Sequence, residues 1–98
     1  MATKLEFTVL EQDQIRSELE KLPEWERDGV AIRKTWVHSS FIEAIAFVNR
    51  VAVIAEKLNH HPDIDISFKR VIIRIWTHKK NATTMADITL AHEIDKIL

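Results

Sequence analysis

Residues 40–77 read SFIEAIAFVNRVAVIAEKLNHHPDIDISFKRVIIRIWT, and they contain a long helical pattern followed by two strand patterns. Ser40 and Glu43 have the spacing of a capping box at the start of the helix. Over residues 41–58 the polar side chains fall on one stripe and the rest are apolar. We therefore expect a central helix over this range, and its apolar surface is wider than packing on one sheet requires.

The chain leaves this helix through Asn59, His60, His61 and Pro62. Asn59 suits the left-handed position just past a helix end, and Pro62 prevents the helix from continuing. The two histidines are therefore expected in a short exit loop.

Two antiparallel hairpins are expected, one on each side of the central helix. Downstream, the alternation in residues 64–68, a turn at Lys69-Arg70 and a β-rich run over 71–77 predict one hairpin. Upstream, Asp28-Gly29 is the signature of a tight turn that leads into a strand over 30–37. The only glycine of the chain would supply the positive φ of that turn.

A helix is also expected near each end of the chain. Thr8 and Glu11 form a capping-box pattern for a helix over about residues 8–22, which a proline ends. Thr84 and Asp87 have the same spacing and can cap a last helix.

Length and composition agree with one small folded unit. The chain has 98 residues, of which 46% are hydrophobic and 30% charged, so we expect a single domain over 1–98. The order α-β-β-α-β-β-α predicts an α+β fold, with a four-stranded antiparallel sheet and helices packed on one face.

Charge and cysteine usage exclude several classes of protein. No cysteine is present, which rules out a disulfide framework and a thiolate zinc site and favours a reducing compartment. The net charge of −1 gives no global field toward nucleic acid or an anionic membrane. No apolar signal segment or membrane-spanning run is visible. We expect a cytoplasmic protein that binds neither nucleic acid nor a membrane.

The polar side chains with most chemical capacity lie near the ends of the predicted elements: Glu56, His60, His61, His78 and Asp87. If the exit loop and the strand end converge, imidazoles oriented by carboxylates would supply general acid/base chemistry near neutral pH. The same residue types could hold a metal ion, but no His-x-His or His-x₃-His spacing occurs. Phosphate loops and Gly-x-Ser-x-Gly nucleophile turns need glycines that the chain lacks.

The spacing of these residues resembles a known family signature, that of the pterin-4a-carbinolamine dehydratases, which include a dimerization cofactor of a hepatocyte transcription factor. The signature here consists of Glu56, three residues, His60-His61-Pro62, five residues, Phe68, nine residues, His78, eight residues and Asp87. The flanking sequence is also similar, including Trp25 and the run of residues 46–52 within the central helix.

The resemblance implies a hydro-lyase that removes water from the 4a-hydroxytetrahydropterin left by an aromatic amino acid hydroxylase, giving quinonoid dihydropterin. It implies no metal or organic cofactor, a pterin substrate, and a homodimer or homotetramer whose sheet extends across a subunit boundary. Its active-site imidazoles correspond to His60, His61 and His78, and its substrate-binding or supporting residues to Glu56, Asn59, Pro62 and Asp87.

Our hypothesis is that His61 and His78 share the roles of acid and base and that His60 binds or orients the pterin. Which imidazole is the acid stays open at this stage. The competing hypothesis is a protein of the same fold that has no dehydratase activity and acts as an assembly partner.

Some residues depart from the family pattern or lie outside it. Ala82-Thr83-Thr84 replaces the common Gly-Leu-Thr/Ser, and the preceding loop, residues 79–81, is unusually basic. Phe68 stands where Tyr or Trp is common. Of the remaining histidines, His38 is interpreted as a strand-end residue and His92 as a helix-surface residue. The tryptophans are interpreted as core or interface packing rather than pterin-stacking groups: Trp25, Trp36 and Trp76.

Overall fold

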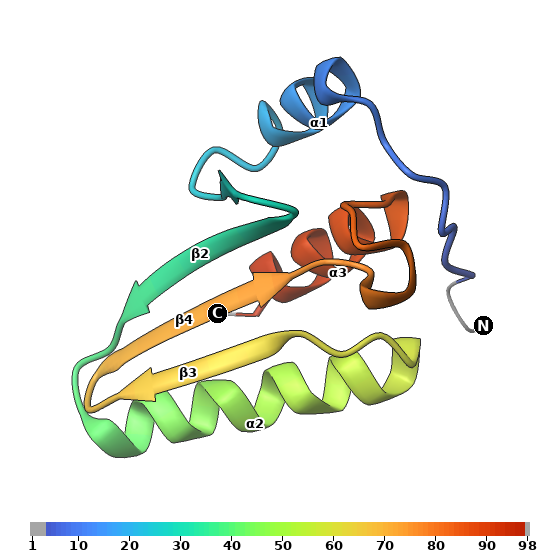
Figure 1. Ribbon diagram of the computed structural model, residues 1–98. Coiled ribbons are helices and arrows are strands. Elements are labelled where there is room, and N and C mark those ends of the chain that lie inside the picture. Colours follow the sequence, from blue (N-terminus) through green and yellow to red (C-terminus); the bar gives the residue numbers. More distant parts are fainter. Residues whose placement is uncertain (1–3, 98) are drawn as a thin grey trace.

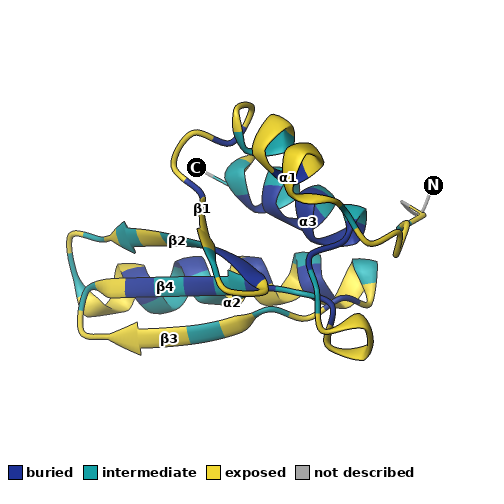
Figure 2. Cartoon of the chain, turned by 45° about the horizontal axis from the view of Figure 1, so that its top comes forward, coloured by how far each residue is buried: buried dark blue, intermediate teal, exposed yellow. Residues whose placement is uncertain are grey.

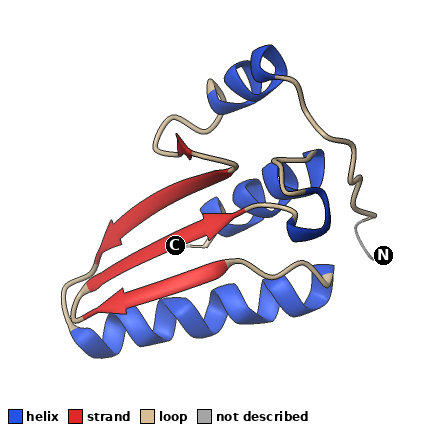
Figure 3. Cartoon of the chain, viewed as in Figure 1, coloured by secondary structure: helices blue, strands red, loops and turns tan. Residues whose placement is uncertain are grey.

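Four strands form one antiparallel sheet in the order β1-β2-β4-β3, and the predicted α+β fold is confirmed (Figure 1, Figure 3). The computed structural model describes residues 4–97. Its elements are α1 (Gln12–Leu19), β1 (Glu26–Asp28), β2 (Ala31–Val37), α2 (Phe41–Leu58), β3 (Asp63–Ser67), β4 (Arg70–Ile75), a 3₁₀ turn η1 (His78–Lys80) and α3 (Met85–Asp95). Only η1 adds to the predicted order.

The hydrophobic core lies between the central strand β4 and the helices α2 and α3. Val71, Ile73 and Ile75 alternate along β4, have no exposed surface and point to one face of the sheet. They belong to one core cluster with Phe47 and Val51 of α2 and with the buried side chains of α3. Buried segments of β4, α2 and α3 are dark blue in Figure 2. This packing fixes where α2 ends and where α3 begins, relative to the end of β4.

The opposite face of the sheet is charged. Arg33 of β2 and Arg74 of β4 are register partners and would repel each other. Arg33 Nε lies 2.9 Å from Glu26 Oε1, and Arg74 Nη2 lies 2.8 Å from Asp28 Oδ2. Carboxylates of the short strand β1 therefore compensate both arginines.

The predicted cap residues of α2 and α3 are confirmed, although at α2 the structure shows only the Ser40 half of the predicted capping box. Ser40 Oγ accepts a hydrogen bond from the Glu43 backbone N–H, and Asn59 ends α2 in the left-handed conformation with φ 52°. Thr84 and Asp87 form the reciprocal capping box of α3.

The predicted start of α1 is wrong. Glu11 and Gln14 make the capping box, so the helix begins at Gln12 rather than near Thr8. The Thr8 carbonyl instead accepts a hydrogen bond from Met85 N–H, and the Leu10 N–H donates to the Thr83 carbonyl. Tertiary pairing with the start of α3 keeps these residues extended.

Both predicted turns are displaced by one residue. The first hairpin loop is Gly29-Val30, with φ 61° at Gly29, and the second is Phe68-Lys69, with φ 56° at Phe68. Phe68 therefore belongs to a turn and not to a strand. No helix within residues 4–97 has the length and apolar character needed to cross a membrane.

Candidate active site

The exit loop of α2 sends its two histidines in different directions. The left-handed Asn59 reverses the chain, and His60 N–H then donates to the Ala55 carbonyl at 3.1 Å. His60 is only 8% exposed, whereas the side chain of His61 is 55% exposed. One imidazole is thus enclosed in the protein and the other faces solvent.

The segment after β4 turns sharply at the same end of the sheet. Thr77 and Ala82 pair as an isolated bridge that closes a loop around His78. Asn81 takes the left-handed conformation of this loop, with φ 49°, and Ala82 has no positive φ. Since Asn tolerates this conformation, the missing family glycine imposes no strain at Ala82.

Asp87 connects the two loops at the start of α3. It has no exposed surface, and its Oδ2 accepts hydrogen bonds from Thr84 N–H at 2.7 Å and from Thr77 Oγ1 at 3.0 Å. Its Oδ1 lies 2.6 Å from His60 Nε2. An ionised carboxylate only accepts, so His60 Nε2–H donates, and Nδ1 is the remaining nitrogen of the ring. Asp87 therefore fixes both the orientation and the tautomer of His60.

Glu56 has the corresponding relation to His61. Glu56 Oε2 lies 2.5 Å from His61 Nε2, and both side chains are exposed. Glu56 therefore contacts His61 as Asp87 contacts His60, with one carboxylate oxygen at one imidazole nitrogen.

The exit loop and the segment after β4 enclose one cavity of about 580 Å³. This volume is within the range of about 300–1,000 Å³ that is usual for small-molecule sites. The cavity is lined by Phe7, Asn59, His60, His61, Trp76, Thr77, His78, Lys79 and Lys80. All three predicted histidines therefore meet in one place.

Of the predicted supporting residues, Asn59 lines the cavity and the other three do not. Glu56 and Asp87 contact His61 and His60 without lining the cavity, and Pro62 does not line it either. Phe68 of the family signature is 65% exposed at the far end of β4, so it is not part of this cavity.

Two aromatic walls of the cavity were not predicted as site residues. Trp76, interpreted from the sequence as core or interface packing, is not part of the core cluster; it stacks on His78 with ring centroids 4.2 Å apart and lines the cavity. The rings of Phe7 and His60 meet edge to face, with their centroids 5.6 Å apart. Trp76 is two residues before His78, and this spacing could have indicated that both side chains lie at the site. Nothing in the local sequence indicates that Phe7 reaches His60.

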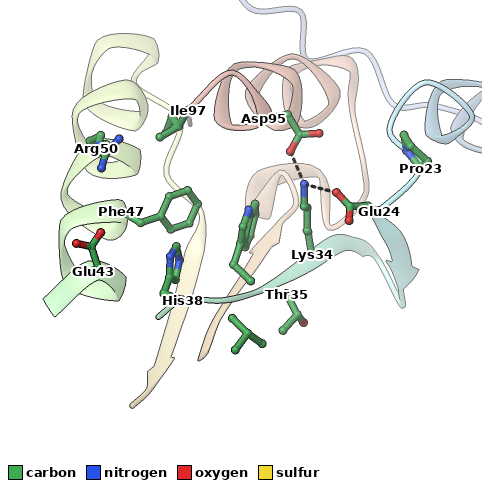
Figure 4. A pocket seen from close by; sticks show the side chains of 12 residues that line it. Pro23, Glu24, Lys34, Thr35, His38, Glu43, Phe47, Arg50, Asp95 and Ile97 are labelled. Carbon is green, nitrogen blue, oxygen red and sulfur yellow. Dashed lines mark hydrogen bonds and ion pairs between the residues drawn. The ribbon is translucent and has the colours of Figure 1, made fainter. Parts of the chain in front are cut away.

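A second cavity, of about 650 Å³, lies between β2, α2 and the end of α3 (Figure 4). Lys34 Nζ is held there at 3.0 Å from Asp95 Oδ1 and 3.1 Å from Glu24 Oε1. Burial acts to lower the pKa of Lys34, but the hydrogen bonds and charges of Asp95 and Glu24 raise it above 10.5 overall. A lysine so firmly charged is a poor general base, and the only histidine in the lining, His38, packs on Phe47.

Neither cavity provides a preformed metal site. Across residues 4–97, no three side chains of histidine, aspartate or glutamate are grouped so that they could hold an ion. The carboxylates near the histidines instead act as hydrogen-bond partners of single imidazole nitrogens.

Comparisons with known proteins agree with the site. The profile of the family described as pterin 4 alpha carbinolamine dehydratase matches residues 8–97. A Thermomicrobium roseum protein named as a candidate pterin-4-alpha-carbinolamine dehydratase is 44% identical over 88 residues, which are 90% of this chain and 95% of that protein. A Sulfurisphaera tokodaii protein with the same name is 40% identical over 89 residues, covering 91% of this chain and 96% of its own.

A solved structure extends the similarity to the backbone. The crystal structure of a transcriptional coactivator/pterin dehydratase from Brucella melitensis matches with a TM-score of 0.85 and 29% identity, over 90% of this chain and 96% of that one. The profile match and the identities span almost the whole sequence, and the chain belongs to the pterin 4 alpha carbinolamine dehydratase family.

Proposed function

We propose that this protein is a hydro-lyase that dehydrates 4a-hydroxytetrahydropterins to quinonoid dihydropterins. The observation that carries the proposal is the single cavity in which His60, His61 and His78 meet. His60 is hydrogen-bonded to Asp87 and His61 to Glu56, and His78 stacks on Trp76. Family membership supports a pterin as the substrate.

The reaction needs one acid and one base. The bond between C4a and the hydroxyl oxygen breaks, the hydroxyl receives a proton and leaves as water, and the proton on N5 is withdrawn as the C4a–N5 double bond forms. General acid/base catalysis of this kind contributes about 10²- to 10⁴-fold to a rate. The substrate supplies all the electrons, so no cofactor is required.

The neighbours of the histidines support a division of roles. His61 is the base, because Glu56 stabilises the imidazolium formed when His61 accepts the N5 proton. His78 is the acid in this proposal, since it lines the same cavity, stacks on Trp76 and has no bonded carboxylate among residues 4–97. Both side chains line the cavity and belong to exposed residues, so each can exchange protons with solvent between turnovers.

His60 is a binding group in this proposal. Its Nε2 is occupied by Asp87, and the ring is almost completely buried. It is therefore suited to orient the pterin from the cavity wall, together with the neighbouring Asn59. Pro62 supports the site indirectly by ending the exit loop before β3.

The proposal includes assembly into a homodimer or homotetramer. Ile42 and Val53 on α2 are 75% and 57% exposed, so the wide apolar surface of this helix is not fully used within one chain. Burial of that surface between copies supports an oligomer. Sedimentation that detects only an 11.4 kDa species at micromolar concentration would contradict it.

The cellular setting is also part of the proposal. The absence of cysteine supports a cytoplasmic location, and a pterin substrate supports a functional link to an aromatic amino acid hydroxylase. These two points depend on the dehydratase activity.

A stopped-flow measurement tests the activity. A 4a-hydroxytetrahydropterin is generated in the presence and absence of the protein, and formation of the quinonoid product is followed by absorbance. The proposal predicts dehydration well above the spontaneous rate. The competing hypothesis of an assembly partner without activity predicts no acceleration.

A further inference from the structure

We propose that the cavity selects pterins whose side chain carries an acidic group, a phosphate ester or a carboxylate, and that Lys79 and Lys80 bind that group. This inference rests on the proposed dehydratase function and specifies its substrate class.

Both lysines are built into the wall of the cavity. They belong to η1, directly after His78, and both line the same cavity as the three histidines. Lys80 N–H donates to the Thr77 carbonyl and Asn81 N–H to the His78 carbonyl, each at 3.1 Å. These bonds hold the backbone of the turn, which carries both lysines, against the cavity.

Neither ammonium group is neutralised by the protein. In the part of the chain that the structure describes, Lys79 and Lys80 have no ion pair and no side-chain hydrogen bond. The carboxylates nearest to the site, Glu56 and Asp87, are bonded to His61 and His60. By contrast, Lys34 in the second cavity is held by two carboxylates.

The local charge differs from that of the whole chain. The protein has a net charge of −1, yet the lining of this cavity within residues 4–97 includes two lysines and no aspartate or glutamate. Such a concave positive patch attracts anions and favours their binding. The aromatic rings of Phe7 and Trp76 can cover the flat pterin, while the two lysines meet its substituent.

The experiment compares three ligands that differ only in one substituent: dihydropterins with a hydroxymethyl group, its phosphate ester or a carboxylate at carbon six. Binding to the full-length protein is followed by the change in tryptophan fluorescence, since Trp76 lines the cavity. We expect about tenfold tighter binding of the acidic ligands at low salt, which corresponds to two ion pairs at an exposed site. This preference should fall as the ionic strength rises.

Three double variants test whether Lys79 and Lys80 cause the preference for acidic ligands. Lys79→Gln with Lys80→Gln should abolish the preference, and Lys79→Arg with Lys80→Arg should retain most of it. Lys21→Gln with Lys69→Gln removes the same charge outside the cavity and should leave it unchanged. A preference for the phosphate alone supports a phosphate ester as the ligand. A preference for both acidic ligands supports recognition of a negative charge, whether phosphate or carboxylate.

Equal affinity for all three ligands would overturn the inference, as would a preference that survives in the glutamine variant. Dehydration of the neutral hydroxymethyl substrate is measured separately. Turnover of that substrate without a charge preference would refute the substrate class and leave the dehydratase function intact, whereas no turnover of either the neutral or the acidic substrates would refute the function itself.

Discussion

His60 Nε2 lies 2.6 Å from Asp87 Oδ1, and the other oxygen of Asp87 closes the capping box of α3. One buried carboxylate therefore starts a helix and orients an imidazole of the candidate active site. Because the residues that it joins come from three segments, the geometry of the site depends on the packing that brings α2, β4 and α3 together.

Asp87→Asn should impair both activity and stability. An amide has one acceptor oxygen, so Asn cannot accept hydrogen bonds from Thr77, Thr84 and His60 together, and a buried donor loses its partner. We expect a loss of kcat/KM of about 10- to 100-fold, as for other residues that orient histidines. Urea denaturation should show that the free energy of unfolding falls by about 1–2 kcal/mol, as it does when other helix caps are removed.

Ser40→Ala provides the matched control. It removes the cap at the start of α2, whereas His60 and His61 follow the other end of this helix, and it should lower the free energy of unfolding by about 1 kcal/mol. Its kcat/KM should equal that of the wild type. A similar loss of activity in both variants would mean that Asp87 acts through general stability and not through His60.

Phe7→Ala should weaken substrate binding while the fold stays intact. The ring is 44% exposed and contacts His60 at the cavity wall, so its loss removes an aromatic surface from the ligand rather than from the core. We expect KM to rise about two- to tenfold with kcat nearly unchanged, the equivalent of one aromatic contact. Val9→Ala, on the same extended segment but outside the cavity, should leave KM unaltered. An unchanged KM in Phe7→Ala would exclude Phe7 from the binding site.

Lys34→Met should reduce stability without changing kcat/KM, because Lys34 belongs to the second cavity. Because the variant loses the ion pair with the partly buried Asp95, its free energy of unfolding should fall by about 1–2 kcal/mol near neutral pH.

The effect should depend on pH in one direction. The pKa of Lys34 is raised in the folded protein, so its contribution is complete below the unfolded pKa of about 10.4. It is lost as the pH rises through the folded pKa. The difference in Tm between wild type and Lys34→Met should therefore be constant from pH 7 to about 10 and shrink above that. A difference that grows with alkaline pH would contradict the raised pKa.

Gly29→Ala should cost about 1 kcal/mol, purely through the backbone. Gly29 has φ 61°, and an added Cβ would meet no atom within 4 Å, so no clash contributes. Gly29→Asn should cost less, because Asn tolerates the left-handed conformation. Urea unfolding of both variants measures this order, and equal losses would show that the turn does not require a positive φ.

Local signals in the sequence were sufficient for the elements that carry their own caps. Ser40 and Asn59 bound α2, and Thr84 with Asp87 starts α3, as predicted. The start of α1 was wrong because two overlapping capping patterns share Glu11, and only the pairing of Thr8 with Met85 decides between them. The turns were displaced because strand register, and not composition, selects which residue takes a positive φ.

From the sequence alone, the site could be predicted only for residues that follow the spacing of the family signature. The signature identified the three histidines, and the structure brings them into one cavity. Phe7 could not be predicted, since its contact with His60 depends on how the N-terminal segment crosses the start of α3. Phe68 is a counterexample, because it belongs to the signature but lies at the far end of the sheet.

The most direct test is the stopped-flow dehydration rate of His61→Ala and His78→Ala, compared with His92→Ala on α3 outside the cavity. Acid/base catalysis by the two imidazoles predicts that each of the first two variants loses about 10²-fold or more in kcat/KM, while His92→Ala retains the wild-type value. Wild-type kcat/KM in both His61→Ala and His78→Ala would contradict the proposed mechanism.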